Sequence, residues 1–174
     1  MKKVCLTSGP RGSGKSTYLK TMRLNYYPKT SIISRDELLM ELFGRIGLDP
    51  YAGEHDYALK ILFERIKKQL FLNIEDAVLF LDCWNGYPSE RRTIIKKLLE
   101  LGADQVFCWQ FIVPLDVCLN WFFKKQDSKG YTENMIINDY NLYYEQALNI
   151  ENDGFDKVYK INPLQLNLPN VPFF

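Results

Sequence analysis

Residues 9–16 read GPRGSGKS and fit the phosphate-binding pattern GxxxxGK[ST] in full. The three glycines of this stretch allow backbone N–H groups to turn inward around phosphate oxygens, with no side chain in the way. Lys15 adds a mobile positive charge for the β- and γ-phosphates, and the Ser16 hydroxyl is a ligand for Mg²⁺. The stretch therefore predicts a site for a nucleoside triphosphate with Mg²⁺. The residues expected to surround the nucleotide are Gly9, Arg11, Gly12, Ser13, Gly14, Lys15, Ser16 and Thr17.

The segments on either side of this loop predict a strand before it and a helix after it. Residues 3–8 form a short apolar run and residues 16–26 have a helical pattern, so the positive end of the helix dipole would point at the phosphates. The rest of the chain continues to alternate between strands and helices. Further strands are expected at 31–34, 76–82, 105–114 and 156–161, and further helices at 35–47, 54–72, 88–102, 115–125 and 132–148.

This alternation predicts an α/β fold in which a parallel sheet of about five strands lies between helices. The apolar run AVLFL at 77–81 supports a sheet that is buried on both faces. With the phosphate loop, the pattern is that of a P-loop NTPase three-layer α/β/α sandwich, and residues 1–174 are expected to form one domain.

The composition is that of an ordinary globular protein, with 47% hydrophobic and 25% charged residues and a formal net charge of +1. So small a net charge gives no sign of a nucleic-acid partner for the molecule as a whole. The four cysteines lack metal-binding spacing and are expected to be buried thiols. No apolar run approaches the length of a transmembrane helix and no signal-peptide pattern is present, so we expect a cytoplasmic protein without a membrane partner.

A phosphate loop alone does not separate motor ATPases, GTPases and kinases. The chain has no NKxD motif of the kind with which GTPases read the base. The strand at 76–82 ends in FLDCWN, with one acid, Asp82, and no adjacent glutamate to polarise a water molecule. The sequence therefore favours transfer of phosphate to an acceptor over hydrolysis, with ATP as the donor.

A second acid, Asp36, lies in the stretch SIISRDELL, directly after the strand at 31–34. The carboxyl ends of the strands line the ligand crevice of an open α/β sheet. A carboxylate there can accept the proton of an acceptor hydroxyl that attacks the γ-phosphate. An acid in the first turn of a helix also stabilises the helix dipole, and the residue by itself leaves both interpretations open.

Three pieces occur in a definite order: GKS at 14–16, SRDELL at 34–39, and DCWN at 82–85 followed by SERR at 89–92. In this order they resemble the polynucleotide 5′-hydroxyl kinase and zeta-toxin-like group of P-loop kinases, over roughly residues 3 to 161. The resemblance implies that Asp36 is the general base. It also implies that Asp82, with Asn85, lies near the metal and the acceptor, with Ser16 and Asp82 at the Mg²⁺. Arginines that open the next helix match Arg91 and Arg92, of which only one usually faces the crevice. The expected acceptor-binding residues are Arg35, Asp36, Asp82, Asn85 and Arg92.

The chain departs from the family pattern at three cationic positions. Leu39 stands where the family often has an arginine that grips the acceptor phosphate. In the expected helical lid, at about 121–133, the two family arginines are replaced by Trp121 and Lys125. Lysine lacks the guanidinium fork, so bidentate phosphate binding is lost. We expect Lys125 to act as the catalytic lid cation, with Lys124 and Lys129 as the other candidates for that charge.

The sequence thus predicts an ATP-dependent kinase that phosphorylates a hydroxyl, with the 5′-OH of DNA, RNA or a nucleotide as the first expectation. Two alternatives stay open. One is a kinase of a small molecule such as a nucleoside, a sugar or a nucleotide-sugar, which the small net charge and Leu39 favour. The other is a regulatory module that binds ATP.

Overall fold

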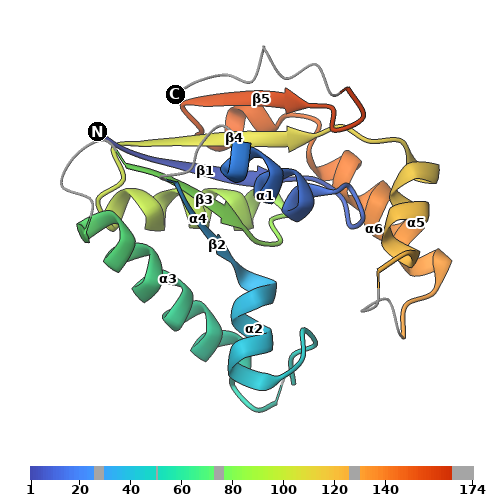
Figure 1. Ribbon diagram of the computed structural model, residues 1–174, viewed down its shortest axis with the longest axis horizontal. Coiled ribbons are helices and arrows are strands. Elements are labelled where there is room, and N and C mark those ends of the chain that lie inside the picture. Colours follow the sequence, from blue (N-terminus) through green and yellow to red (C-terminus); the bar gives the residue numbers. More distant parts are fainter. Residues whose placement is uncertain (26–29, 50, 73–76, 126–129, 166–174) are drawn as a thin grey trace.

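The computed structural model describes residues 1–25, 30–49, 51–72, 77–125 and 130–165 (Figure 1). Five strands form one sheet in which every neighbouring pair is parallel, in the order β2-β3-β1-β4-β5. The strands are β1 (Lys2–Ser8), β2 (Ser31–Ser34), β3 (Ala77–Asp82), β4 (Gln105–Phe111) and β5 (Lys157–Ile161). The predicted five-stranded parallel sheet is therefore confirmed.

The helices alternate with the strands as predicted, with small differences at their ends. They are α1 (Lys15–Asn25), α2 (Arg35–Phe43), α3 (Glu54–Leu72), α4 (Pro88–Glu100), α5 (Leu115–Phe123) and α6 (Glu133–Gln146), followed by the short 3₁₀ helix η1 (Ile150–Asp153). The prediction of a helix to residue 47 is wrong, because α2 ends at Phe43. Gly44 has φ 68° and its N–H bonds to the carbonyl of Met40, which closes the helix four residues earlier. The sequence reading also missed η1.

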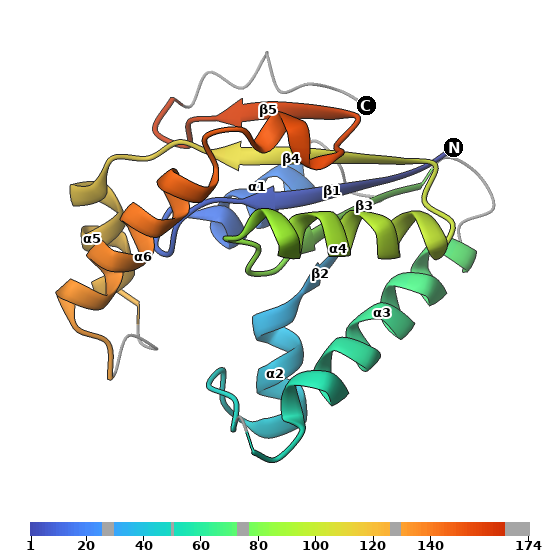
Figure 2. The ribbon, with the colours of Figure 1, turned by 180° about the vertical axis from the view of Figure 1, so that it is seen from behind.

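Helices cover both faces of the sheet, which gives the predicted three layers. Leu62 and Ile66 of α3 and Ile95 of α4 pack on one face, while Leu19 and Met22 of α1 pack on the other. Figures 1 and 2 show these two sides, with α1 on one and α4 on the other. Strand residues alternate between the two cores, so the strands are apolar on both faces. Within the described residues, no helix is long and apolar enough to cross a membrane.

Parallel strands end at a common edge of the sheet, and this edge collects the polar residues that follow them. Asp82 at the end of β3 is level with Thr7 of β1 and with Ser34 of β2. The phosphate loop leaves β1 at this edge, and α2 leaves β2 there. The sheet therefore brings the loop, Asp36 and Asp82 together although they are far apart in sequence.

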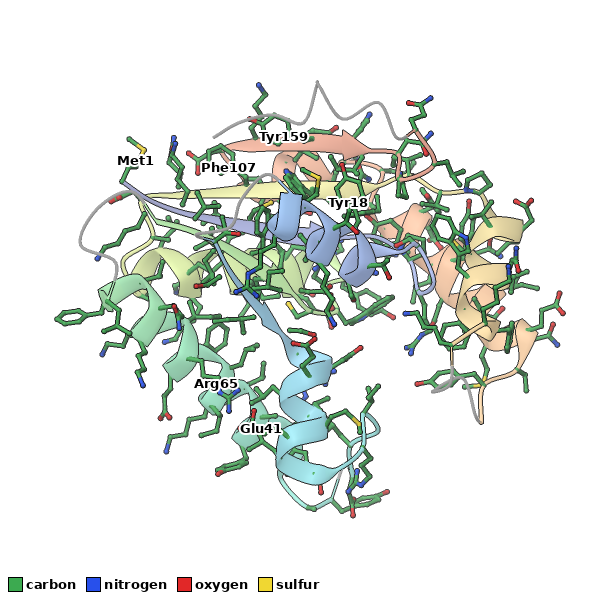
Figure 3. The ribbon with its side chains drawn as sticks, in the orientation of Figure 1. Met1, Tyr18, Glu41, Arg65, Phe107 and Tyr159 are labelled. Carbon is green, nitrogen blue, oxygen red and sulfur yellow. The ribbon has the colours of Figure 1, made fainter. Side chains whose placement is uncertain are left out.

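An ion pair on the surface joins α2 to α3. The two terminal guanidinium nitrogens of Arg65, Nη2 and Nη1, donate to the carboxylate of Glu41 at 2.6 and 2.9 Å. Figure 3 shows the two side chains meeting between their helices. Leu38 of α2 and Leu62 of α3 belong to the same buried core, which holds the two helices together beneath this contact.

Arg91 of α4 is fully buried and binds structural partners. Its Nε donates to Asp153 at 2.6 Å, and its other nitrogens donate to the carbonyls of Asn85, Gly86 and Gln146 at 2.7–3.1 Å. A buried arginine with this many acceptors ties the loop after β3 to the C-terminal end of α6 and to η1. Arg91 is therefore part of the framework that supports the site.

We expect Arg91→Met to lower the free energy of unfolding by about 3–5 kcal/mol, because among the described residues it leaves the buried carboxylate of Asp153 with Arg92 alone as a charged partner. The matched control is Arg92→Met, since Arg92 binds the same carboxylate at 3.2 Å but is 61% exposed. Its loss should cost less than about 1 kcal/mol. Urea denaturation followed by circular dichroism measures both. Equal losses for the two variants would contradict the role given to Arg91.

Candidate active site

The phosphate loop is held in shape by close contact with α5. Gly12 has φ 78°, and a Cβ at this position would lie 2.3 Å from the carbonyl oxygen of Cys118. Both the backbone angle and the space therefore require glycine here. The loop leads directly into α1, which begins at Lys15, so the N–H groups of the first helical turn face the end of the sheet.

Lys15 is bound to its own loop. Its Nζ donates to the carbonyls of Gly9 at 2.9 Å and Pro10 at 3.0 Å. Burial lowers the pKa of Lys15, the Asp82 carboxylate acts in the opposite direction, and Lys125 adds to the lowering. A cation that is partly desolvated and has a lysine neighbour is suited to an anionic ligand with several negative charges.

The Ser16 hydroxyl and the Asp82 carboxylate form the pair of oxygen groups expected for a metal. Ser16 Oγ donates to Asp82 Oδ2 at 2.5 Å, and Thr7 Oγ1 donates to Asp82 Oδ1 at 2.9 Å. Mg²⁺ prefers oxygen ligands and usually takes only one or two from the protein, with water and phosphate completing its shell. Ser16 and Asp82 fit this requirement and would hold the ion, whose charge would help to neutralise the phosphates.

A central cleft of about 540 Å³ opens in front of these groups. It is lined by the phosphate loop, the first turns of α2, the segment after α2 and the end of β3, together with Phe122 and Lys125 around the end of α5 and Tyr131 before α6. Among the described residues of its lining, five cationic side chains face two carboxylates, so the cleft is suited to a polyanion. The lining includes Lys15, Ser16, Asp36, Asp82 and Lys125, which the sequence analysis assigned to catalysis or to the metal.

Asp36 lies in the first turn of α2, at the mouth of the central cleft. Its side chain is 65% exposed, yet the surrounding cleft wall still withdraws part of its water shell. This partial burial raises the pKa of Asp36, and the Asp82 carboxylate raises it further, against the opposing effect of Arg35. Arg35 Nη1 lies 3.9 Å from Asp36 Oδ1. A carboxyl with a raised pKa is a better match to a proton that must be taken up near neutral pH.

Other predicted nucleotide residues take different places. Arg11 lines the central cleft, and its side chain is bound by two residues of the chain. Its Nε donates to Asp139 of α6 at 2.8 Å, and its Nη1 donates to the hydroxyl of Tyr131 at 3.0 Å. Ser13 is buried, and a Cβ on Gly9 would lie 2.8 Å from Phe111 Cβ. These two residues of the loop therefore lie on the side that packs against the rest of the protein.

Two predicted acceptor residues are not among the described residues that line the central cleft. Asn85 is buried, and its Nδ2 donates to the carbonyls of Thr7 at 2.7 Å and Cys83 at 2.9 Å, so it ties β1 to the loop after β3. Arg92 points to Asp153 instead. Both residues therefore support the framework around the cleft, and the contact of each with the acceptor stays a prediction. Lys129 lies outside the described residues.

The burial of Leu39 accounts for the absence of an arginine at this position, where the resembling kinases often have one. Its side chain is fully buried in the protein, where an arginine would be left without water. The neighbouring Met40 lines the central cleft instead. The cleft also receives Arg45, whose Nη2 binds Glu54 at 2.7 Å, and Tyr131. Met40, Arg45 and Tyr131 were given no definite role from the sequence, because no local pattern marks residues that reach the site through tertiary packing.

A second pocket, of about 410 Å³, continues from the central cleft along α1. The two share Gly14 and Lys125. The α1 pocket is lined largely by apolar and aromatic groups, among them Tyr18, Met22, Trp121 and Pro163. Figure 3 shows Tyr18 on α1, and its ring meets Phe111 edge to face, with centroids 5.4 Å apart. Thr17, predicted to contact the nucleotide, also lines this pocket.

No protein-family model matches the chain, and no curated protein sequence matches it. Solved structures do. A chain of the Pnkp1/Rnl/Hen1 RNA repair complex matches with a TM-score of 0.72 at 17% identity, over 85% of this chain and 46% of that one, so the chain spans less than half of its length. The tunicamycin resistance protein of Deinococcus radiodurans matches with a TM-score of 0.61 at 15% identity, over 95% and 88% of the two chains.

Shikimate kinase from Bacteroides thetaiotaomicron matches with a TM-score of 0.57 at 10% identity, over 92% of this chain and 87% of that one. At identities this low the likeness is one of fold. The protein has the fold of the P-loop kinases.

Proposed function

We propose that the protein is an ATP-dependent kinase that transfers the γ-phosphoryl group to an alcohol hydroxyl. The observation that carries this proposal is the single cleft that holds Lys15, the Ser16–Asp82 pair and Asp36. The first two would bind a triphosphate with its metal, and the third would stand on the side open to an acceptor. The apolar α1 pocket, which adjoins the loop, would hold the base of the nucleotide.

The reaction needs only a few movements of bonds and protons. The acceptor hydroxyl gives its proton to the Asp36 carboxylate while its oxygen forms a bond to the γ-phosphorus. The bond between that phosphorus and the oxygen bridging to the β-phosphate breaks, and ADP leaves. Lys15 and Lys125 would neutralise the charge that spreads over the phosphoryl oxygens as this happens. The chain's contribution is therefore mainly position and charge.

The finer proposal is that the acceptor is the 5′-OH of a polynucleotide, which the sequence resemblance supports. A second acceptor class, an uncharged small alcohol, is favoured by how the cleft cations are engaged. Arg11 binds Asp139, Arg45 binds Glu54, and Arg35 lies beside Asp36. A polynucleotide needs cations for its phosphates, and these three already have carboxylate partners.

Transfer from γ-labelled ATP tests the proposal, with 5′-OH DNA and RNA oligonucleotides offered beside nucleosides and sugars in the presence of Mg²⁺. Label on any hydroxyl acceptor supports the kinase. Label on oligonucleotides whose binding weakens with salt would support the polynucleotide acceptor. Tight ATP binding without transfer to any acceptor would overturn the kinase and leave the alternative of a regulatory ATP-binding module.

We expect Arg35→Met to move the acid limb of the rate profile to higher pH, by up to about one pH unit. Arg35 is the nearest cation that opposes the rise in the pKa of Asp36, so its loss raises that pKa further. A base works as the carboxylate, and activity is lost as pH falls through its pKa. The measurement is kcat against pH at saturating substrates. Arg35→Lys keeps the charge and should keep the profile, while an unmoved limb in Arg35→Met would contradict the assignment.

A further inference from the structure

A third pocket, of about 650 Å³, opens from the acceptor side of the central cleft. The two cavities share Arg11, Arg35, Cys83 and Trp84 in their walls. Asp36 follows Arg35 in the first turn of α2, so a molecule in this side pocket could reach the proposed base with a hydroxyl. The side pocket is thus placed to hold the part of the acceptor that does not react.

The walls of the side pocket are mainly apolar. They come from α3, α4, α6 and the end of β3, and they include Leu59, Phe63, Ile94 and Leu142. The volume lies in the range of pockets that enclose a small molecule, which is about 300–1,000 Å³. His55 also belongs to this lining.

The charges in the lining balance, unlike those of the central cleft. Among the described residues of this lining, the formally charged ones are Arg11, Arg35, Glu90 and Asp139, two of each sign. Arg11 and Asp139 also bind each other, at 2.8 Å. Burying an unpaired charged group in an apolar pocket is costly. The lining therefore favours an uncharged occupant, while the phosphates are drawn to the cationic central cleft.

Trp84 stands where the two cavities meet and offers a flat aromatic surface. A Cβ on Gly86 would lie 2.4 Å from Cζ2 of the Trp84 indole, so the loop backbone supports the indole closely. The indole is only partly buried and contributes to the walls of both cavities. An aromatic ring fixed in this way is a stacking partner for another flat ring.

We propose that the side pocket binds the body of an uncharged small alcohol that carries a flat ring, stacked on Trp84, with its hydroxyl directed to Asp36. The inference rests on the proposed kinase function and narrows its acceptor to a nucleoside-sized molecule without a charged group next to the ring. Trp84 then determines acceptor specificity, and Gly86 is a positioning residue that acts through it.

Binding of three ribosides tests this proposal without the need for turnover. Methyl riboside, phenyl riboside and uridine share the sugar hydroxyls and differ in the ring. Calorimetric titrations use the full chain saturated with a non-hydrolysable ATP analogue and Mg²⁺. We expect at least one ring-bearing riboside to bind about tenfold or more tightly than methyl riboside, from the free energy of stacking. If neither does, the proposal is overturned.

Variants separate stacking from general damage. Trp84→Ala should remove the tenfold preference for the ring and leave the affinity for methyl riboside and for the ATP analogue unchanged. Gly86→Ala should weaken the preference as well, because its methyl group displaces the indole. The control is Tyr51→Ala, which removes an aromatic ring that is 96% exposed and lines none of the three pockets. A preference that survives Trp84→Ala would overturn the role of Trp84.

A fourth ligand distinguishes this proposal from the polynucleotide acceptor. Uridine 3′-monophosphate adds a charge where a polynucleotide would continue. We expect it to bind no more tightly than uridine, with little effect of salt. Binding that is about tenfold tighter and falls steeply with salt would overturn the proposal in favour of a polynucleotide. The kinase proposal is tested independently by the transfer assay, and it fails if ATP binds but no hydroxyl is phosphorylated.

Discussion

Asp36→Asn is expected to lower the rate of phosphoryl transfer by about 10²–10⁴-fold, which is the usual contribution of a general base. The amide keeps the shape of the side chain at the mouth of the central cleft but cannot take up the proton of the acceptor. ATP binding should change little, because the kinase proposal assigns the phosphates to Lys15 and the Ser16–Asp82 pair, and Asp36 to the acceptor. The measurements are single-turnover transfer from labelled ATP and calorimetric binding of the nucleotide.

Glu37→Gln is the matched control for Asp36→Asn. Glu37 is the next residue of the same helical turn, binds Lys20 at 2.9 Å on the surface, and does not line the cleft. Its replacement should leave the rate of transfer unchanged. If Asp36→Asn also leaves transfer unchanged and lowers stability by only about 0.3–1 kcal/mol, Asp36 merely stabilises the N-terminus of α2. That result would support the other interpretation of Asp36, in which the acid only stabilises the helix dipole.

Lys15→Met is expected to reduce both the affinity for ATP and the rate of transfer, the latter by about 10²–10³-fold, as for other preorganised charges that meet developing negative charge. Lys15 Nζ is held within the loop by the carbonyls of Gly9 and Pro10. The loop itself should keep its fold, because Gly12 and the contacts with α5 define it. Nucleotide titration and single-turnover transfer report the two effects separately.

Lys20→Met provides the control for Lys15→Met on the same helix. Its side chain is 63% exposed and pairs with Glu37, away from the three pockets. Both ATP binding and transfer should survive this change. Unaltered binding and transfer in Lys15→Met would remove the phosphate role from the loop and with it the basis of the kinase proposal.

Local sequence patterns predicted most of the fold. The strands follow from short apolar runs, and the helices from their 3.6-residue periodicity and their glycine ends. The boundary of α2 was the clearest failure. Two glycines follow that helix, and only the hydrogen bond from Gly44 to Met40 shows which of them ends it.

The arginines of α4 show a different kind of limit. The family resemblance implied that one of them faces the crevice, and neither is among the described residues that line the central cleft. Asp153 of η1 binds both of them, at 2.6 and 3.2 Å. Because Asp153 lies 62 residues from Arg91, no local pattern could identify it as the partner.

Local patterns in the sequence were sufficient to identify the phosphate loop, the order of strands and helices along the chain, and the two acids at the ends of neighbouring strands, Asp36 just after β2 and Asp82 as the last residue of β3. These depend on backbone conformation and on residues close together in the chain, which a local pattern records. The tertiary structure decided which side chains reach the site. It directed Arg11 to Asp139, buried Leu39, bonded Asn85 to Thr7 and Arg92 to Asp153, and brought Trp84 to the boundary between two pockets. The positions of these side chains depend on burial and on hydrogen bonds between residues far apart in sequence, which a local pattern does not record.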